Sequence, residues 1–580
     1  MSRTRLAGLA LVVAALLAGC ANIPEQSSPQ AVPNGGGNPP GPNTSPDDDA
    51  DPLTLVRGFV GAAGNPEVAK GYLTPEAREA WQADAPPTII DETFVTAPLP
   101  IQDRRAQGQE QPNEFTVVLT VTKVGRLGSD RAFVPAFGSE EYRVQVRRDN
   151  ASAPWRIQTP PEPVLISLPD FTASYQQVRV YFFDPEFRVI VPDLRYVLAQ
   201  PGGVPDRVVR LLLDGPSDTL VNAVKTAIED GAELRTNAVA DTDGALVVNL
   251  TKLGDLTPDE RDLIAAQIVL TLRDVTQSRI RLMVDGQALV PGHGDWRPSD
   301  VPSYDAVAKP NADLPGMFTN TATGRVHSLR NGDPVAGPAG NGDLRVTSAA
   351  QSFDGSSIAV VHEVPTGARL RIGPIGQPLA EVDLEASTLT RPTWLFGTPT
   401  AASNEVWTVQ NGVDVFRVVR TGTGTWSPSK VNAGVLREFG TITDLRLSRD
   451  GVRMAAVANG QVVVATVVRA RDSVTIQSPR TLQGTRVKDV VGVDWRSQDT
   501  VVVATAQTGQ LVLNLSVDGF DVKPYTSQNL GTPVSAIAAA PDRDVVVTDR
   551  VGMWTSSDTN QVWQLQPQHQ IPGARPFYPG

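Results

Sequence analysis

Apolar and polar residues follow two different periods along the first part of the chain. After Asp51-Pro52, an N-cap residue followed by Pro in the first turn, apolar residues recur at helical spacing up to Val60. Between residues 115 and 121 they instead alternate with threonines, which is typical of a half-buried strand. Shorter strands follow over residues 142–147 and 155–157. Helices followed by an antiparallel sheet predict an α+β domain over residues 51–165.

A second segment, residues 170–295, mixes strands with two clear helices. The first helix runs from Pro205 to Leu213 and is closed by Gly215-Pro216. The second opens on Thr257-Pro258-Asp259-Glu260, a capping box in which Thr257 and Glu260 each bond the other's backbone. Strands are predicted over residues 178–182, 189–191, 245–250 and 280–284. This order predicts a second α+β domain.

The third segment, residues 305–575, repeats a β-rich unit. A strand begins every 44 to 48 residues, at Ile358, Val406, Met454, Val501 and Val545. A hairpin glycine recurs with a similar period, at Gly324, Gly367, Gly412, Gly460, Gly509 and Gly552. A period of about 45 residues fits a four-stranded propeller blade, so we predict a β-propeller of about six blades. The alternative is a pair of stacked sheets with chance spacing.

The N-terminus has the pattern of an export signal. Arg3 and Arg5 precede an apolar run of about 12 residues, which is too short to span a bilayer. The run ends in Leu17-Ala18-Gly19-Cys20, which resembles a bacterial lipobox, and Cys20 is the single Cys of the chain. We therefore predict a signal peptide over residues 1–19, cleaved between Gly19 and Cys20, with diacylglyceryl, N-acyl (palmitate-type) modification of Cys20. Residues 20–50, rich in Pro, Gly and Asn, are predicted to be a disordered tether.

Composition narrows the function further. The 580 residues carry a net charge of −12, which disfavours nucleic acid as a partner. One Cys excludes an internal disulfide, and four scattered His (His293, His327, His362 and His569) make a metal cluster improbable. Asp241 and Asp243 stand at alternate positions, but the following residues break a calcium loop, so a hairpin turn is favoured.

No catalytic motif is present. Gly215-Pro216-Ser217 lacks the second glycine of a nucleophile elbow, and His362-Glu363 lacks the second His of a zinc helix. Short glycine pairs such as Gly422 and Gly424 lack the third glycine of a nucleotide loop. We therefore predict no catalytic residue, no metal site and no cofactor. The predicted inner strands of the propeller are rich in Val and Ala, with no acidic residue at a fixed repeat position.

Each segment resembles a known module. Residues 51–165 look like the NTF2-like modules of envelope proteins, which can hold a small ligand, although a plain packed spacer is favoured. In the second segment, YFF at 181–183, LLLDGPS at 211–217, ALVVNL at 245–250 and VDG at 284–286 resemble the GerMN domain of spore-germination and envelope lipoproteins. That resemblance implies an α+β binding module and brings no catalytic residue.

The chain has, in order, a lipobox, a tether, an NTF2-like domain, a GerMN domain and a propeller. This order resembles that of the actinobacterial LpqB lipoprotein family. The resemblance implies a lipid-anchored protein on the outer face of the cell membrane. It also implies an accessory partner of the sensor histidine kinase MtrB, which tunes phosphorylation of MtrA and so affects cell-wall metabolism and division. The alternative is a propeller enzyme acting on envelope glycans or lipids through carboxylates in its central funnel. Clustered Asp and Glu on the inner strands would favour the enzyme.

Overall fold

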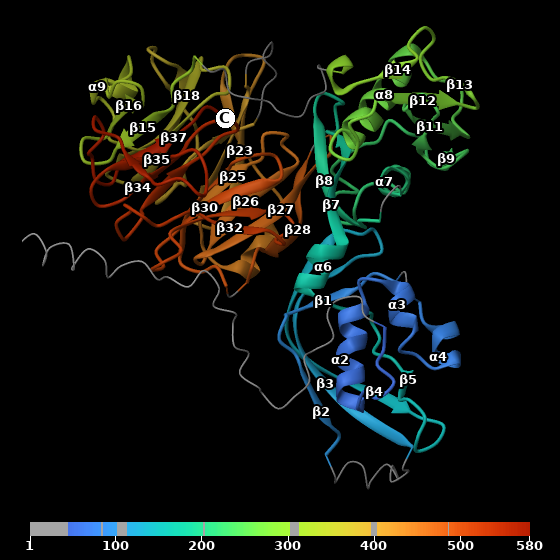
Figure 1. Ribbon diagram of the computed structural model, residues 1–580. Coiled ribbons are helices and arrows are strands. Elements are labelled where there is room, and N and C mark those ends of the chain that lie inside the picture. Colours follow the sequence, from blue (N-terminus) through green and yellow to red (C-terminus); the bar gives the residue numbers. More distant parts are fainter. Residues whose placement is uncertain are drawn as a thin grey trace, which may run out of the picture. The chain divides into compact units, whose positions relative to one another are not determined.

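The computed structural model describes residues 45–580, apart from residues 83–84, 101–112, 201–202, 302–312, 396–402, 472 and 485. Residues 41–580 form one compact unit. The predicted signal peptide, Gly19, Cys20 and most of the predicted tether lie outside the described residues. Within them, the chain is multidomain and strand-rich, with few helices, as the sequence predicts (Figure 1).

The N-terminal domain packs three short helices against a curled sheet. Asp51 caps the first helix by accepting hydrogen bonds from the backbone N–H groups of Leu53 and Thr54. The sheet has the order β5-β4-β3-β1-β6, and β2 pairs with β3. The helices are α2 (Pro52–Ala62), α3 (Pro66–Lys70) and α4 (Pro75–Ala80). The strands are β1 (Thr88–Ile90), β2 (Val95–Pro98), β3 (Glu114–Leu127), β4 (Phe133–Arg147), β5 (Arg156–Thr159) and β6 (Leu165–Ser167).

The two long strands of this sheet bend at a bulge. The register of β3 against β4 shifts between Lys123 and Gly125. A Cβ atom at Gly125 would lie 2.2 Å from the ring of Phe133, so only glycine allows this ring to lie across the strand. The bend carries Phe133 out of the domain's main core, which is built on α2, and into a second apolar cluster with Phe171 and Tyr196.

The central domain contains a two-stranded ribbon and a separate mixed sheet. The ribbon pairs β7 with β8, and in the sheet β11 runs parallel to β12. Its helices are α6 (Leu168–Ser174), α7 (Val204–Leu213), α8 (Pro258–Leu272) and the 3₁₀ helix η1 (Pro298–Asp300). Its strands are β7 (Tyr175–Phe183), β8 (Ile190–Leu198), β9 (Glu233–Leu234), β10 (Val239–Ala240), β11 (Leu246–Thr251), β12 (Ile280–Val284), β13 (Gln287–Ala288) and β14 (Asp295–Trp296).

Helix α8 links the ribbon to the rest of the central domain. The capping box predicted at Thr257 and Glu260 is present. Gln267 is fully buried in this helix, where it donates to the carbonyl of Tyr181 at 2.9 Å and accepts from the N–H of Ala227 at 2.8 Å. Strand β8 extends to Leu198, well beyond the predicted residues 189–191. The prediction was too short because Asp193 and Arg195 are polar, yet both are buried in β8 as an ion pair of 2.7 Å.

The C-terminal domain is a β-propeller of six sheets, as predicted (Figure 1). Blades 2 to 6 each have four antiparallel strands in chain order. All five predicted strand starts fall at or next to the first residue of a blade's second strand. The strands of blades 2 to 4 are β17 (Val346–Gln351), β18 (Ser357–Val364), β19 (Gly367–Pro374), β20 (Ala380–Glu381), β21 (Thr393–Trp394), β22 (Glu405–Gln410), β23 (Asp414–Arg420), β24 (Trp426–Lys430), β25 (Ile442–Leu447), β26 (Arg453–Ala458), β27 (Gln461–Arg469) and β28 (Val474–Thr481). Those of blades 5 and 6 are β29 (Val490–Trp495), β30 (Thr500–Thr505), β31 (Val512–Ser516), β32 (Val522–Pro524), β33 (Ala536–Ala538), β34 (Val545–Thr548), β35 (Met553–Ser556) and β36 (Gln564–Leu565).

Blade 1 closes the ring with strands from both ends of the domain. Its strands are β15 (Met317–Asn320), β16 (Arg325–Ser328) and the C-terminal β37 (Arg575–Phe577). β37 pairs with β15, so that Phe577 stands opposite Met317. The described strand from the N-terminal end of the domain begins at Met317. Two short helices, α9 (Pro338–Asn341) and the 3₁₀ helix η3 (Gly434–Phe439), lie in connections between blades.

Candidate functional site

The centre of the propeller is filled by an arginine. Arg391, which precedes β21, donates to the carbonyls of Val493, Ile537 and Pro576 at 3.3–3.4 Å. These carbonyls belong to the innermost strands of blades 5, 6 and 1. The side chain of Arg391 is only 11% exposed. One guanidinium therefore ties together the inner strands of three blades.

Two aspartates on inner strands face this arginine. Asp444 on β25 and Asp494 on β29 lie 3.7 and 3.5 Å from Arg391, and Asp494 also lies 3.7 Å from Arg446. Burial, together with the like charge of Arg391, lowers the pKa of Arg446 to about 10. The two aspartates stand at non-equivalent positions of β25 and β29, so they do not mark a fixed repeat position, and each is accommodated because an arginine neutralises it. Both carboxylates are held in ion pairs, which differs from the free carboxylate pair of a glycosidase.

The central domain contacts the propeller through polar side chains. Arg179 on β7 lies 2.6 Å from Asp499, and Tyr196 on β8 donates to Asp518 at 2.8 Å. The hydroxyl of Thr466 donates to the carbonyl of Thr219 at 2.8 Å. Burial opposes ionisation of Asp499, but Arg179 and Ser497 hold the pKa of this carboxyl below its ordinary value. Burial raises the pKa of Asp518.

An aromatic cluster joins all three domains at the same place. Phe520, in the turn after β31, lies 5.1 Å from Phe133 of the N-terminal domain. It lies 5.4 Å from Phe171 and 5.2 Å from Tyr196 of the central domain. Because these rings come from three parts of the chain, the domains are packed as one body rather than as independent modules.

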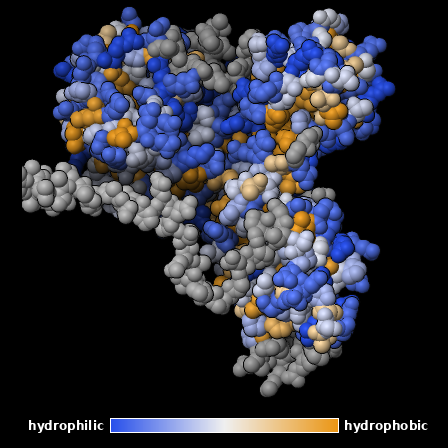
Figure 2. Space-filling view, viewed as in Figure 1, coloured by the Kyte–Doolittle hydropathy of each residue, from blue (hydrophilic) through white to orange (hydrophobic). Residues whose placement is uncertain are grey.

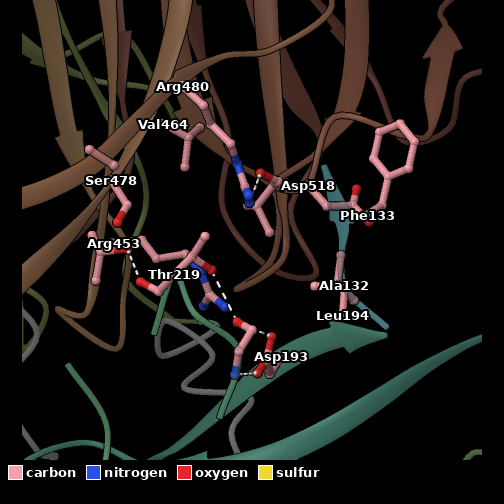
Figure 3. A pocket seen from close by; sticks show the side chains of 14 residues that line it. Ala132, Phe133, Asp193, Leu194, Thr219, Arg453, Val464, Ser478, Arg480 and Asp518 are labelled. Atoms are coloured by element: carbon pink, nitrogen blue, oxygen red, sulfur yellow. Dashed lines mark hydrogen bonds between the residues drawn. The ribbon is translucent and has the colours of Figure 1, made fainter. Parts of the chain in front are cut away.

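A small cavity lies within this junction (Figure 3). Arg480 and Asp518 reach it from the propeller, and Asp193 reaches it from β8. Its volume of about 20 Å³ holds about one water molecule. Asp193 accepts hydrogen bonds from Arg195 and from both the N–H and the hydroxyl of Ser217, at 2.7–2.9 Å. Ser217, considered above as a nucleophile, therefore binds a structural carboxylate.

The four His residues lie in three settings, because His327 and His569 both pack on the ring of Phe318. His362 accepts a hydrogen bond from Arg371 at 3.1 Å, and burial with this neighbouring cation lowers the pKa of the imidazole. The rings of His327 and His569 contact the carbonyls of Gly332 and Leu329 at 2.9 and 2.8 Å. His293 stacks on Trp296 with a centroid distance of 3.9 Å. Among the described residues, no group of His, Cys, Asp and Glu is arranged to hold a metal ion.

The Asp241–Asp243 segment is a hairpin turn between β10 and β11, as favoured from the sequence. Arg281 lies 3.0 Å from Asp241 and 2.7 Å from Asp243, and Arg279 lies 2.8 Å from Asp243. The hydrogen bond from Arg281 lowers the pKa of the Asp243 carboxyl. Arginines thus occupy the carboxylate oxygens that a calcium ion would need.

One face of the propeller meets the N-terminal domain through the connection between β28 and β29, where Arg486 lies 3.6 Å from Asp91. Successive strands of a blade are antiparallel, so the turns between second and third strands lie on the face opposite to the turns between first and second strands. Asp499, which pairs with Arg179 of the central domain, lies in a turn between a first and a second strand. Among the described residues, no hydrogen bond or ion pair joins the second-to-third turns to residues before 302. We call the face that carries these turns the hairpin face.

The hairpin face carries exposed apolar side chains. Val413 and Val551 lie in second-to-third turns and are 46% and 43% exposed. Val435 in η3 and Val491 at the start of β29 are 43% and 37% exposed at the same face. Charged groups lie among them, such as Asp414 with Lys430 and Arg437 at 3.0 and 3.4 Å. In the view of Figure 2 the hydrophobic residues of the molecule form separate patches between hydrophilic ones.

Sequence reasoning missed the residues that join the domains. A usable signal was present in the turns: Ser and Asp two residues apart recur at 352–354, 448–450, 497–499 and 516–518. In each turn the Ser hydroxyl donates to the Asp carboxylate. Two of these aspartates, Asp499 and Asp518, also bind the central domain. Arg391 had no such signal, because it lies outside the regular strands.

Family models match nearly the whole described chain. "Lipoprotein LpqB, N-terminal domain" matches residues 45–172, and "Sporulation and spore germination", the model of the GerMN region, matches residues 179–290. "Lipoprotein LpqB beta-propeller domain" matches residues 324–579. None of the described helices has the length and apolar character needed to cross a bilayer.

Whole-length relatives carry the same description. A "Lipoprotein LpqB" of Rhodococcus opacus is 30% identical over 616 residues, covering 100% of this chain and 98% of the relative. Those of Mycolicibacterium smegmatis and Mycobacterium tuberculosis are 30% and 28% identical, covering 99% and 100% of this chain and 99% and 100% of the relatives. Among solved structures, a chain of a nidogen/laminin complex matches with a TM-score of 0.32 and 9% identity, covering 45% of this chain and 97% of that one.

Proposed function

The chain belongs to the LpqB lipoprotein family, and from this premise we propose that it binds and modulates an MtrB-type sensor histidine kinase. In this proposal Cys20 carries the lipid anchor, and the body lies on the extracytoplasmic side of the cell membrane. The observation that supports a binding role is the hairpin face, where exposed valines and charged groups lie on a rigid ring. An exposed mixture of apolar and charged side chains fits a protein partner better than a small substrate.

The anchor gives the mechanism its physical basis. Confinement of both proteins to one membrane raises their effective concentration, to the mM range for short flexible linkers, so weak docking is sufficient. The body shifts the kinase between its signalling states only if it binds one state more tightly than the other. The three-domain junction matters here because domains packed against one another transmit a docking preference that a flexible chain would lose.

A binding experiment tests the proposal. The soluble body, residues 41–580, is titrated against the purified extracytoplasmic domain of an MtrB-type kinase. We expect Val413→Glu with Val551→Glu to weaken binding at least tenfold, because buried charges at an interface centre are costly. The matched control is Val221→Glu with Val239→Glu, two valines of the central domain that are similarly exposed at 53% and 52%.

Four outcomes would count against the proposal. The kinase partnership fails if the unmodified body does not bind the kinase domain, and the assigned face fails if both pairs of substitutions act equally. Turnover of peptidoglycan fragments or glycolipids, lost on Asp444→Asn or Asp494→Asn, would replace binding by the alternative of an envelope enzyme. The role of the anchor fails if the untethered body restores full kinase output at matched copy number.

A further inference from the structure

A large cavity with a mainly apolar lining lies in the N-terminal domain. Its volume is about 770 Å³. It is bounded by the end of α4, by β4 and β5, and by the segment between β5 and β6. Small-molecule sites commonly have volumes of about 300–1,000 Å³, so this cavity is large enough to hold a ligand.

The floor of the cavity is apolar. Ala77, Pro161 and Val164 are buried there, and the rings of Trp81 and Tyr142 are half-buried at its sides. Trp81 packs against both apolar clusters of the domain and lies 5.6 Å from Phe59, which fixes its ring. Such a floor offers no buried donor or acceptor side chain to a water-soluble metabolite, but it favours the burial of a hydrocarbon chain.

The rim is polar and carries a free cation. Arg143 and Gln158 are exposed at the cavity and make no hydrogen bond or ion pair with any described residue. Glu162 is exposed on the same rim, so both signs of charge are present. An unpaired guanidinium is suited to a phosphate group, which it can bind through two parallel hydrogen bonds.

We propose that this cavity binds a phospholipid, with one acyl chain on the Trp81–Tyr142 floor and the phosphate at Arg143. The division into an apolar floor and a charged rim matches the division of an amphiphile into tail and head. The inference is independent of the kinase partnership. The start of the described chain is held beside the same strand. Asp48 forms a 2.7 Å ion pair with Arg156 of β5, the strand that also carries Gln158. The predicted anchor Cys20 precedes Asp48 by 28 positions in the sequence.

Trp81 provides a direct readout. The body, residues 41–580, is mixed with a lysophospholipid whose acyl chain is brominated, and tryptophan fluorescence and native mass are measured together. Bromine quenches only indoles in contact with the chain, and Trp81 is one of nine tryptophans, so we expect partial quenching with a bound mass of one lipid. Trp81→Phe should abolish the quenching while the bound mass remains. Ala80→Trp, which fills the cavity mouth, should abolish both.

The head group is tested separately. Arg143→Gln should weaken lysophospholipid binding about tenfold, the effect of losing a charge-assisted contact, and leave binding of a brominated fatty alcohol unchanged. Arg147→Gln, four residues along the same strand and outside the cavity, is the matched control. Inorganic phosphate alone should not compete. The proposal is overturned if no lipid binds, if Trp81→Phe leaves quenching intact, or if phosphate competes as well as the lipid does.

Discussion

The hydroxyl of Tyr196 donates a 2.8 Å hydrogen bond to the carboxylate of Asp518, and this bond crosses from the central domain to the propeller. Both side chains are buried, at 2% and 3% exposure. Asp518 also accepts from the hydroxyl of Ser516 and the N–H of Phe520. The same carboxylate therefore fixes a propeller turn and holds a neighbouring domain against it.

Removal of the Tyr196 hydroxyl should loosen this junction. Tyr196→Phe keeps the ring in the aromatic cluster but leaves Asp518 short of one donor, at a cost of about 1–3 kcal/mol. We expect faster hydrogen exchange in residues 516–521 and a lower melting temperature. Tyr525→Phe is the control, because the hydrogen bond of that hydroxyl within the described part of the chain is to Asn514 of its own blade, at 3.4 Å. Equal effects of the two substitutions would contradict the assigned role.

The junction should also depend on pH. Burial raises the pKa of Asp518, although its hydrogen bonds with Ser516, Phe520 and Tyr196 oppose the rise. The folded state therefore binds more protons than the unfolded state just above pH 3.8, and the stability that depends on Asp518 falls as the pH rises through the raised pKa. Asp518→Asn keeps an acceptor without a charge.

The stability of Asp518→Asn relative to the unchanged protein should accordingly rise between pH 4 and pH 8. Melting temperatures of both proteins across this range measure the difference. Other buried acids, such as Asp450, titrate in both proteins and cancel. Asp521→Asn, at a half-buried neighbour, is the control. A difference that stays constant or falls as the pH rises would show that Asp518 is ionised at no cost in the folded protein.

Arg391 should be essential for the stability of the ring. Arg391→Ala removes a cation beside Asp444 and Asp494, whose side chains are only 13% and 12% exposed, and leaves Asp494 to its ion pair with Arg446. It also removes a donor from a carbonyl in each of three blades. We expect a loss of about 3–5 kcal/mol in denaturant unfolding of the propeller. Adding Asp444→Asn and Asp494→Asn should restore part of this loss. Arg437→Ala, at a side chain 64% exposed on the hairpin face, should change stability by less than about 1 kcal/mol.

Cys20 remains the predicted attachment site of the lipid. Cys20→Ala should release the protein from the membrane fraction, because two or three acyl chains anchor a protein firmly whereas the folded body alone does not. Labelling of cells with a fatty-acid probe should mark the unchanged protein and not the variant. A labelled variant, or a variant that stays in the membrane after a high-salt wash, would contradict the prediction.

Much of the fold follows from short-range pattern. The capping box at Thr257 and Glu260, the alternation along β3 and the 45-residue period of the propeller are each local consequences of helix or strand geometry. They could be predicted because the residues that decide them lie within a few positions of each other, or repeat. The family resemblance, read from the same local segments, agrees with the family models.

The central arginine and the domain junction could not be predicted in this way. Arg391 bonds strands about 100 to 185 residues away, and Tyr196 meets Asp518 across 322 positions. The local pattern also predicted too short a strand at β8. In the sequence, the polar Asp193 and Arg195 indicate the end of a strand, whereas the structure buries them as an ion pair within it. The sequence by itself determined the elements, the repeat and the predicted anchor. Only the tertiary structure decided which charges are buried in pairs, which valines of the propeller stay exposed, and where the N-terminal domain opens a cavity, since burial depends on which other parts of the chain pack alongside.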